Sequence, residues 1–327
     1  MLSDIAELYA TSPLLLTGSV FVIGLMIGSF LNVVIYRLPL MLEREWRAQA
    51  AEILPHAGAA PDPTTDPGAV SGAGASSQLG PSAGLAGLPE RFSLVVPRSA
   101  CPVCRAPITA WQNIPVISWI ALRGRCAACK TRISARYPAV ELATAVLSAW
   151  AAWHFGFSAA TASALLVTWT LIALTGIDVD HQLLPDGITL PLLWAGLLAA
   201  VIIGPRPGAS LPVSPRDAVV GAAAGYVSLW LVFHAFRLIT GKEGMGYGDF
   251  KLFAALGAWM GWKVLPLIIL LSAGTGALLG IAMILLRGRD RAAPMPFGPY
   301  LAAAGWLAML YGNSLIDGYL RFSGLKH

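Results

Sequence analysis

Thirty-six consecutive residues, 142–177, carry no formal charge, and this run constrains the fold more than any other feature of the sequence. As a single α-helix it would be about 54 Å long, whereas the hydrocarbon core of a bilayer is about 30 Å thick. The chain must therefore turn back within the run, and residues 154–156 are the natural break. The run predicts two membrane-spanning helices.

Further apolar runs of helical length recur along the chain. The mean hydropathy of +0.68 and a charged content of only 12% exclude an ordinary soluble domain. The predicted fold class is an all-α polytopic membrane protein with about eight transmembrane helices and a loop domain between the first two. The first span lies within residues 8–36, and the others are expected near 137–153, 159–177, 187–203, 218–236, 250–262, 264–286 and 297–316.

The Lys and Arg residues indicate which side of the membrane each loop occupies. With the N-terminus outside, the inside segments hold 17 of the 22 basic residues, as the positive-inside rule requires. The net charge of +5 thus reflects loops at a membrane, so we expect lipid and not nucleic acid as a partner. The predicted inside segments are 37–137, 178–186, 237–251 and 287–291.

The long inside segment after the first span changes composition along its length. Residues 37–55 predict an amphipathic helix at the membrane surface, with Leu42 and Trp46 on its apolar side. Residues 56–89 consist mainly of Ala, Gly, Pro and Ser and predict a disordered linker. The expected organisation is a first transmembrane helix, a surface helix, a linker, a cytoplasmic four-cysteine domain and a seven-helix membrane core, at residues 1–36, 37–55, 56–89, 90–137 and 138–327.

All four cysteines of the chain occur as two C-x-x-C pairs separated by 21 residues. Each pair can supply two thiolates to a tetrahedral structural zinc site, in which the metal replaces a hydrophobic core. Two disulfides or uncoordinated thiols are the alternative, although disulfides require an oxidising compartment. The predicted metal ligands are Cys101, Cys104, Cys126 and Cys129.

Two acidic clusters lie at the ends of apolar runs on the predicted inside. Asp249 follows three spaced glycines and precedes about 13 apolar residues, or about 20 Å of helix, which is too short to cross the bilayer. We therefore expect this helix to begin in a recessed, protein-lined cleft. Asp178, Asp180 and Asp186 form the second cluster. An ionised carboxylate near the bilayer centre costs roughly 3 kcal/mol, so acids placed there indicate function.

Glycines near the acidic motif and elsewhere predict close approach between helices. Gly244, Gly246 and Gly248 would allow the backbone before Asp249 to pack closely and turn. Two Gly-x-x-x-Gly pairs, 221/225 and 276/280, predict close helix contacts in the membrane.

Two carboxylates at one site share a proton, so that one acts as general base for a water molecule and the other polarises the scissile carbonyl. This pattern favours an aspartyl protease embedded in the membrane. The alternative is structural, with Asp186 as a helix N-cap and Asp178 or Asp180 as a solvated helix end. A nucleotide-binding G-x-G loop is disfavoured because no strand precedes it. A transporter would more typically show repeated halves, and no internal repeat is found.

The chain resembles the bacterial type IV prepilin peptidases, which are bifunctional leader peptidases and N-methyltransferases. The resemblance covers nearly the whole chain and includes both C-x-x-C pairs. A related intramembrane protease with another substrate is less favoured, because the cysteine pairs and the motif at residues 28–39 belong to the prepilin enzymes. The other matching motifs are GSFLNVVIYRLP at 28–39, NIPVISW at 113–119, RYPAVEL at 136–142, LPD at 184–186, EGMGYGDFKL at 243–252 and PFGP at 296–299.

This resemblance implies the catalytic pair and the reaction. In the family, the first catalytic aspartate lies eight residues before the aspartate of the Leu-Pro-Asp element, which selects Asp178, and the second is Asp249 of the glycine motif. The implied activity removes the short basic leader of type IV prepilins and type II secretion pseudopilins after a glycine, on the cytoplasmic side of the inner membrane. The new N-terminal residue, usually phenylalanine, is then methylated with S-adenosylmethionine. No residue of the sequence is assigned to the methyl donor.

Overall fold

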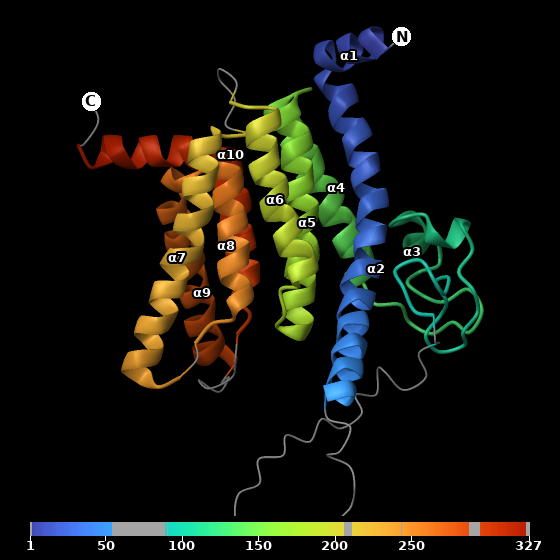
Figure 1. The fold of residues 1–327 in the computed structure, drawn as a ribbon. Helices are drawn as coiled ribbons and strands as arrows, with labels where there is room; N and C mark the ends of the chain where they lie inside the picture. Colours follow the sequence, from blue (N-terminus) through green and yellow to red (C-terminus); the bar gives the residue numbers. More distant parts are fainter. Residues whose placement is uncertain are drawn as a thin grey trace, which may run out of the picture.

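The computed structural model describes residues 2–53, 89, 91–205, 211–242, 244–287 and 295–324. Within these residues the protein is helical and contains no strand (Figure 1). The α-helices are α1 (Leu2–Thr11), α2 (Pro13–Ile53), α3 (Ile117–Ala121), α4 (Arg136–Phe155), α5 (Ala159–His181), α6 (Asp186–Ile202), α7 (Pro215–Thr240), α8 (Tyr247–Met260), α9 (Leu265–Arg287) and α10 (Gly298–Phe322). The described residues also contain two 3-10 helices, η1 (Trp111–Asn113) and η2 (Trp262–Val264).

The apolar runs of the sequence correspond to α2 and to α4 through α10. Four helical stretches have both the length and the hydropathy needed to cross a membrane, and α6 is a shorter apolar helix. The four are Pro13–Ile53, Ala159–His181, Pro215–Thr240 and Trp262–Leu286. The all-α polytopic class is therefore confirmed, while the count of eight crossings stays a prediction.

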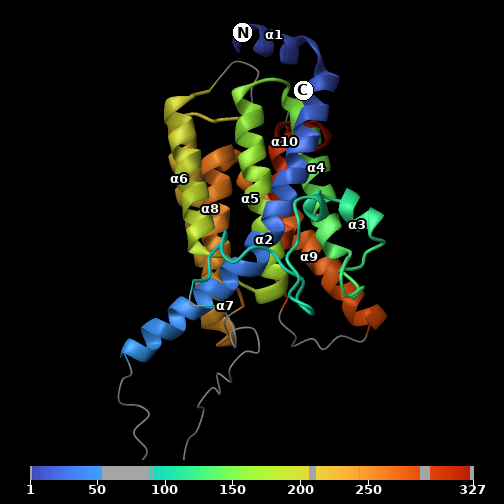
Figure 2. The same ribbon diagram turned by 90° about the vertical axis from the view of Figure 1, so that its right-hand side faces the viewer.

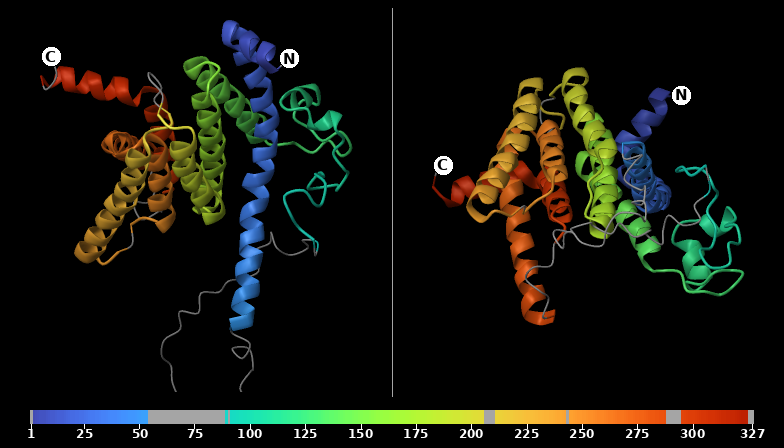
Figure 3. Two further views of the ribbon diagram at one scale, coloured as in Figure 1. Left: turned by 45° about the horizontal axis from the view of Figure 1, so that its top comes forward. Right: turned by 60° about the horizontal axis from the view of Figure 1, so that its bottom comes forward.

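The N-terminal boundaries differ from the prediction. The uncharged run that begins at residue 8 is divided at Ser12 into the separate helix α1 and the start of α2. At its other end, α2 continues through Pro39 to Ile53, so residues 38–53 are not a separate helix. The reason is local: residues 40–53 are mostly Leu, Met, Glu, Arg and Ala, which are strong helix formers. Figure 3 shows this continuation projecting from the bundle.

The predicted linker, residues 56–89, lies outside the described residues apart from Pro89. The four-cysteine segment that follows it lies beside α2, on the side away from α7 (Figures 1 and 3). Arg37 holds this segment to α2, because its buried guanidinium donates hydrogen bonds to the carbonyls of Ser93 and Pro97 at 2.8 and 2.7 Å.

Close contact between α2 and α4 explains part of the first family-like motif. A Cβ atom at Gly28 would lie 2.6 Å from the Cα of Glu141, so a larger residue would force the helices apart. Further along α2, the amide of Asn32 donates to the carbonyl of Tyr137 at 3.0 Å. The buried carboxylate of Glu141 in turn accepts the backbone N–H of Val116 at 2.7 Å. These contacts join α2, α4 and the four-cysteine segment.

Helix α8 forms the centre of the membrane core. Every residue from Leu252 to Met260 is buried, as expected for a helix that is apolar on all faces. The predicted pair Gly221/Gly225 packs on it: their Cβ positions would collide with backbone atoms of Gly257 and Phe253. At Gly276 and Gly280 the nearest atoms belong to the side chains of Tyr300 and Met295 and are 3.5 Å away, an ordinary contact. Only the first Gly-x-x-x-Gly pair therefore marks a contact that requires glycine.

The two ends of the bundle carry different features. Figures 1 and 2 show α1 at one end, while the turn after α5 and the start of α8 lie toward the other. In Figure 1, α8 also begins well inside the level reached by the end of α7. Both acidic clusters thus lie at the end opposite the N-terminus, and the glycine motif is set back within the bundle.

Candidate active site

The end of α5 separates the two aspartates of its acidic cluster. Residues two apart on a helix point in different directions, because each residue turns the helix by about 100°. The side chain of Asp178 is buried, at 5% exposure, whereas Asp180 forms an ion pair with Arg136 at 2.6 Å on the partly exposed side of α5. Gln182 closes the helix in the left-handed region, with φ of 52°, and its N–H donates to the carbonyl of Asp178.

The glycine motif brings Asp249 against the α5–α6 turn. A Cβ atom at Gly248 would lie 2.7 Å from the Cβ of Leu184, so glycine permits this approach. Gly246 is the N-cap of α8 with an ordinary φ of −82°, which means that the motif requires close packing and not a left-handed turn. Asp249 is 7% exposed and follows in the first turn of α8.

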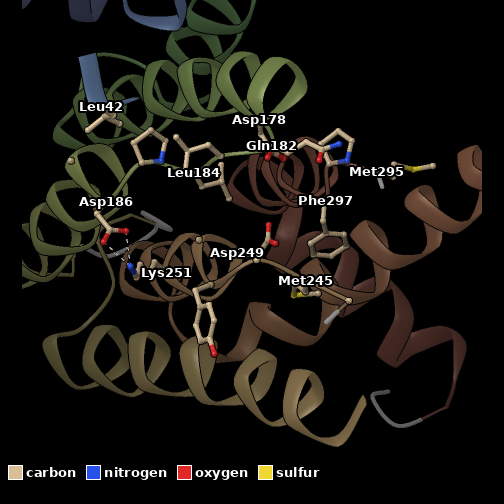
Figure 4. A pocket seen from close by; sticks show the side chains of 18 of the residues that line it. Leu42, Asp178, Gln182, Leu184, Asp186, Met245, Asp249, Lys251, Met295 and Phe297 are labelled. Atoms are coloured by element: carbon tan, nitrogen blue, oxygen red, sulfur yellow. Dashed lines mark hydrogen bonds and ion pairs between the residues drawn. The ribbon is translucent and has the colours of Figure 1, made fainter. Parts of the chain in front are cut away.

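Asp178 and Asp249 line one cleft with a volume of about 620 Å³. Figure 4 shows their carboxylates on facing walls near its middle. No described Lys, Arg or His lies within ion-pair distance of either aspartate. The cleft therefore holds two buried carboxylates without cationic partners, which is the arrangement that two-carboxylate chemistry requires.

The remaining acid of the cluster has a structural partner. Asp186 is the first residue of α6, not its N-cap, and its carboxylate accepts hydrogen bonds from Lys251 at 2.6 and 2.7 Å. Lys251 lies two residues after Asp249, so this ion pair joins α6 to α8 at the edge of the cleft. The structure thus brings together Asp178 and Asp249 and leaves Asp180 and Asp186 in ion pairs.

Gly298, at the start of α10, contacts the cleft in a way that the sequence alone did not indicate. Its N–H donates to Asp178 Oδ2 at 2.9 Å, and a Cβ atom there would lie 2.6 Å from the same oxygen. Only glycine allows this bond, which orients the carboxylate. The signal in the sequence was a glycine between an aromatic residue and Pro299, immediately before an apolar helix.

Five apolar residues line the cleft that the sequence analysis did not assign to it. Leu42 and Trp46 come from the continuation of α2, and Figure 4 shows Leu42 at the Asp186 end of the cleft. Met245, Met295 and Phe297 form the opposite end, beyond the two aspartates (Figure 4).

The four cysteines form a second cluster, outside the helix bundle. Their sulfur atoms all lie within 4.8 Å of one another, and none forms a disulfide. The distances are 3.8 Å between Cys101 and Cys129 and 3.9 Å between Cys104 and Cys126, so each C-x-x-C pair faces the other. Hydrogen bonds with the hydroxyl and backbone of Thr131 lower the pKa of the Cys129 thiol to about 6. The prediction of one four-thiol cluster is confirmed, and such a cluster can hold a metal.

Comparisons with known proteins cover both halves of the chain. The family model described as Bacterial Peptidase A24 N-terminal domain matches residues 22–155, which include the four cysteines. The model described as Type IV leader peptidase family matches residues 165–281, which include Asp178 and Asp249.

Curated proteins match over nearly their whole length. The "Prepilin leader peptidase/N-methyltransferase" of Stutzerimonas stutzeri is 50% identical over 319 residues, covering 98% of this chain and 99% of that protein. The proteins of the same name from Pseudomonas aeruginosa and Aeromonas salmonicida are 49% and 51% identical and cover 97% and 96% of this chain and 98% and 97% of their own. No solved structure matches the chain.

Proposed function

The chain belongs to the type IV leader peptidase family, and from this premise we propose that it is a prepilin leader peptidase and N-methyltransferase in which Asp178 and Asp249 perform the cleavage. The observation that carries the assignment of residues is the single cleft that holds both buried carboxylates. The substrates are type IV prepilins and type II secretion pseudopilins, cut after the glycine that precedes the mature chain.

The two carboxylates divide the work of peptide hydrolysis. One is ionised and removes a proton from a water molecule, which attacks the scissile carbonyl carbon. The other is protonated and donates a hydrogen bond to the carbonyl oxygen as charge develops on it. When the intermediate collapses, the C–N bond breaks and the leaving amine takes up a proton. The N–H of Gly298 holds Asp178 in position through these steps.

The ion pairs in the structure support this choice of aspartates. Asp180 faces Arg136 and Asp186 faces Lys251, so each of these carboxylates already has an ion-pair partner. A carboxylate held in this way is poorly suited to exchange protons with a substrate. Asp178 and Asp249 have no such partner among the described residues.

We place the cleft on the cytoplasmic side of the bacterial inner membrane. The loops at the cleft end of the bundle belong to segments that collect most of the basic residues, in accord with the positive-inside rule. A basic leader emerging in the cytoplasm would meet the cleft there, while the apolar segment of the prepilin stays in the lipid.

The direct test supplies the purified protein in lipid with a prepilin and labelled S-adenosylmethionine. We expect a shortened pilin and, separately, label on its new N-terminus, because methyl transfer needs a methyl donor and a free amine but no activated water. Cleavage is followed by the change in pilin mass and methylation by incorporated label. Intact prepilin after incubation with well-inserted protein would refute the proposed peptidase.

We also propose that the four cysteines hold a structural zinc ion. Four sulfurs at about 2.3 Å from a tetrahedral zinc lie about 3.8 Å apart, and the pairs measured above lie 3.8 and 3.9 Å apart. The metal would be bound by Cys101, Cys104, Cys126 and Cys129 and would take no part in peptide hydrolysis. It would link the two halves of a segment that has little hydrophobic core of its own.

Replacing Cys101 and Cys104 together by Ser is expected to reduce bound zinc from about one ion per chain to nearly none. Because the metal joins both C-x-x-C pairs, proteolysis within residues 91–135 should become faster, while the helix bundle stays folded. Elemental analysis and limited proteolysis measure the two effects, with chelator-treated wild type as the comparison. Wild-type protein that contains no zinc and resists proteolysis equally would contradict the zinc site.

A further inference from the structure

The continuation of α2 beyond Pro39 forms a wall of the catalytic cleft. Leu42 and Trp46 are one helical turn apart and both line the cleft. Leu42 lies at the end that also contains Asp186 (Figure 4). This continuation projects past the helix bundle (Figure 3), away from the end that carries α1 (Figure 1). The sequence predicts that this part of the chain lies at the membrane surface. In the structure, two of its residues line the catalytic cleft.

The side chains on this face of α2 are available to a ligand. Trp46 is 50% exposed, and its ring has no aromatic or cationic neighbour among the described residues. Glu45 is exposed and makes no ion pair within the described chain. At about 100° per residue, Glu45 lies about 60° around the helix from Leu42 and about 100° from Trp46, at the edge of the side that these two residues form. We call these three residues the α2 face.

The other charged residues nearby on α2 are engaged elsewhere. Arg47 pairs with Glu43 at 2.7 Å, and Arg44 donates a hydrogen bond to the carbonyl of Pro89 at 2.9 Å. The α2 face therefore combines an apolar surface, an aromatic ring and an unpaired carboxylate, immediately beside the catalytic cleft. A peptide with Lys or Arg side chains has complementary chemistry: the cation binds the face of an indole ring and a carboxylate, and the alkyl stem packs on leucine.

We infer that the α2 face binds the basic leader peptide of the prepilin and thereby fixes the direction in which the substrate lies in the cleft. This inference rests on the proposed function, since it places the leader on the α2 side of the two aspartates. The mature end then lies toward Met245, Met295 and Phe297 (Figure 4). The polar leader meets the part of α2 that projects from the bundle, and the apolar segment stays beside the membrane core.

The test measures cleavage of two prepilins, one with its natural leader and one in which a leader Lys is replaced by Glu. Trp46→Ala and Glu45→Lys are expected to raise KM for the natural prepilin by about three- to tenfold with little change in kcat, because binding energy away from the scissile bond is lost. Relative to wild type, Glu45→Lys should shift the ratio of kcat/KM for the two prepilins toward the Glu-containing leader. The size of this shift measures the coupling between residue 45 and the exchanged leader residue.

Glu52→Lys is the matched control, because it makes the same charge change about 10 Å further along α2. Its effect on KM should be clearly smaller. The ratio of kcat/KM for the two prepilins is measured on each preparation, so the fraction of folded enzyme cancels. Equal effects of Glu45→Lys and Glu52→Lys, or a ratio unchanged by Glu45→Lys and Trp46→Ala, would overturn the leader-binding face. Failure of the wild-type enzyme to cut either prepilin would instead overturn the proposed function.

Discussion

An Asp249→Asn substitution is expected to abolish prepilin cleavage while the protein stays folded in the membrane. The amide keeps the size of the carboxylate and part of its hydrogen bonding, but it cannot take up or release the catalytic proton. The rate of leader removal should fall by about 1,000-fold or more. The measurement is the initial rate of pilin shortening by purified protein, with helical content and thermal unfolding compared with wild type.

Two further measurements show whether Asp249 acts with Asp178 as one unit. The double Asn variant should be no slower than either single variant, because residues that act together are strongly non-additive. The single variants Asp178→Asn and Asp249→Asn should both still methylate a pilin that has already been cut, since that reaction needs no activated water. Loss of methylation in a well-folded Asp249→Asn protein would show that the cleft serves both reactions and contradict this separation.

A Gly257→Ala substitution is expected to destabilise the membrane core severely. The backbones of α7 and α8 touch at Gly221 and Gly257, and the added methyl group would overlap the carbonyl of Gly221. Backbone cannot move aside as a flexible side chain can, so α7 must shift away from α8. Overpacking of this kind costs about 3 kcal/mol or more. The thermal midpoint of the protein in detergent or lipid reports the loss.

Gly274→Ala on α9 is the matched control for this prediction. No heavy atom would lie within 4 Å of the new methyl group, so the change adds helix propensity without a clash. Its thermal midpoint should equal or slightly exceed that of wild type. Equal midpoints for Gly257→Ala and Gly274→Ala would mean that α7 and α8 do not touch as described.

The helices of the membrane core could be predicted because a helix in an apolar environment must be a nearly uncharged run. The recessed start of α8 followed from its length alone, since 14 residues span only about 21 Å. The cysteine cluster could be predicted because both pairs had ligand spacing. Each of these features depends on residues close together in the sequence.

The features that could not be predicted depend on contacts between distant residues. Spacing alone did not separate Asp178 from Asp180 or Asp186; the separation comes from Arg136 on α4 and Lys251 on α8. The role of Gly298 requires the start of α10 to meet the end of α5, 120 residues earlier. The length of α2 was missed because the change to charged residues after residue 36 suggested a new element, whereas helix propensity beyond Pro39 carries the helix onward.

The central claim, that Asp178 and not its neighbour completes the catalytic pair, is tested most directly by comparing Asp178→Asn with Asp180→Asn. Both substitutions replace a carboxyl group by an amide in the same turn of α5, and the initial rate of prepilin cleavage is measured for both purified proteins. Asp178→Asn should show no detectable cleavage. Asp180→Asn should stay within about tenfold of wild type, because it loses only a partly exposed ion pair with Arg136. Substantial cleavage by Asp178→Asn, or its complete loss in folded Asp180→Asn, would contradict the assignment.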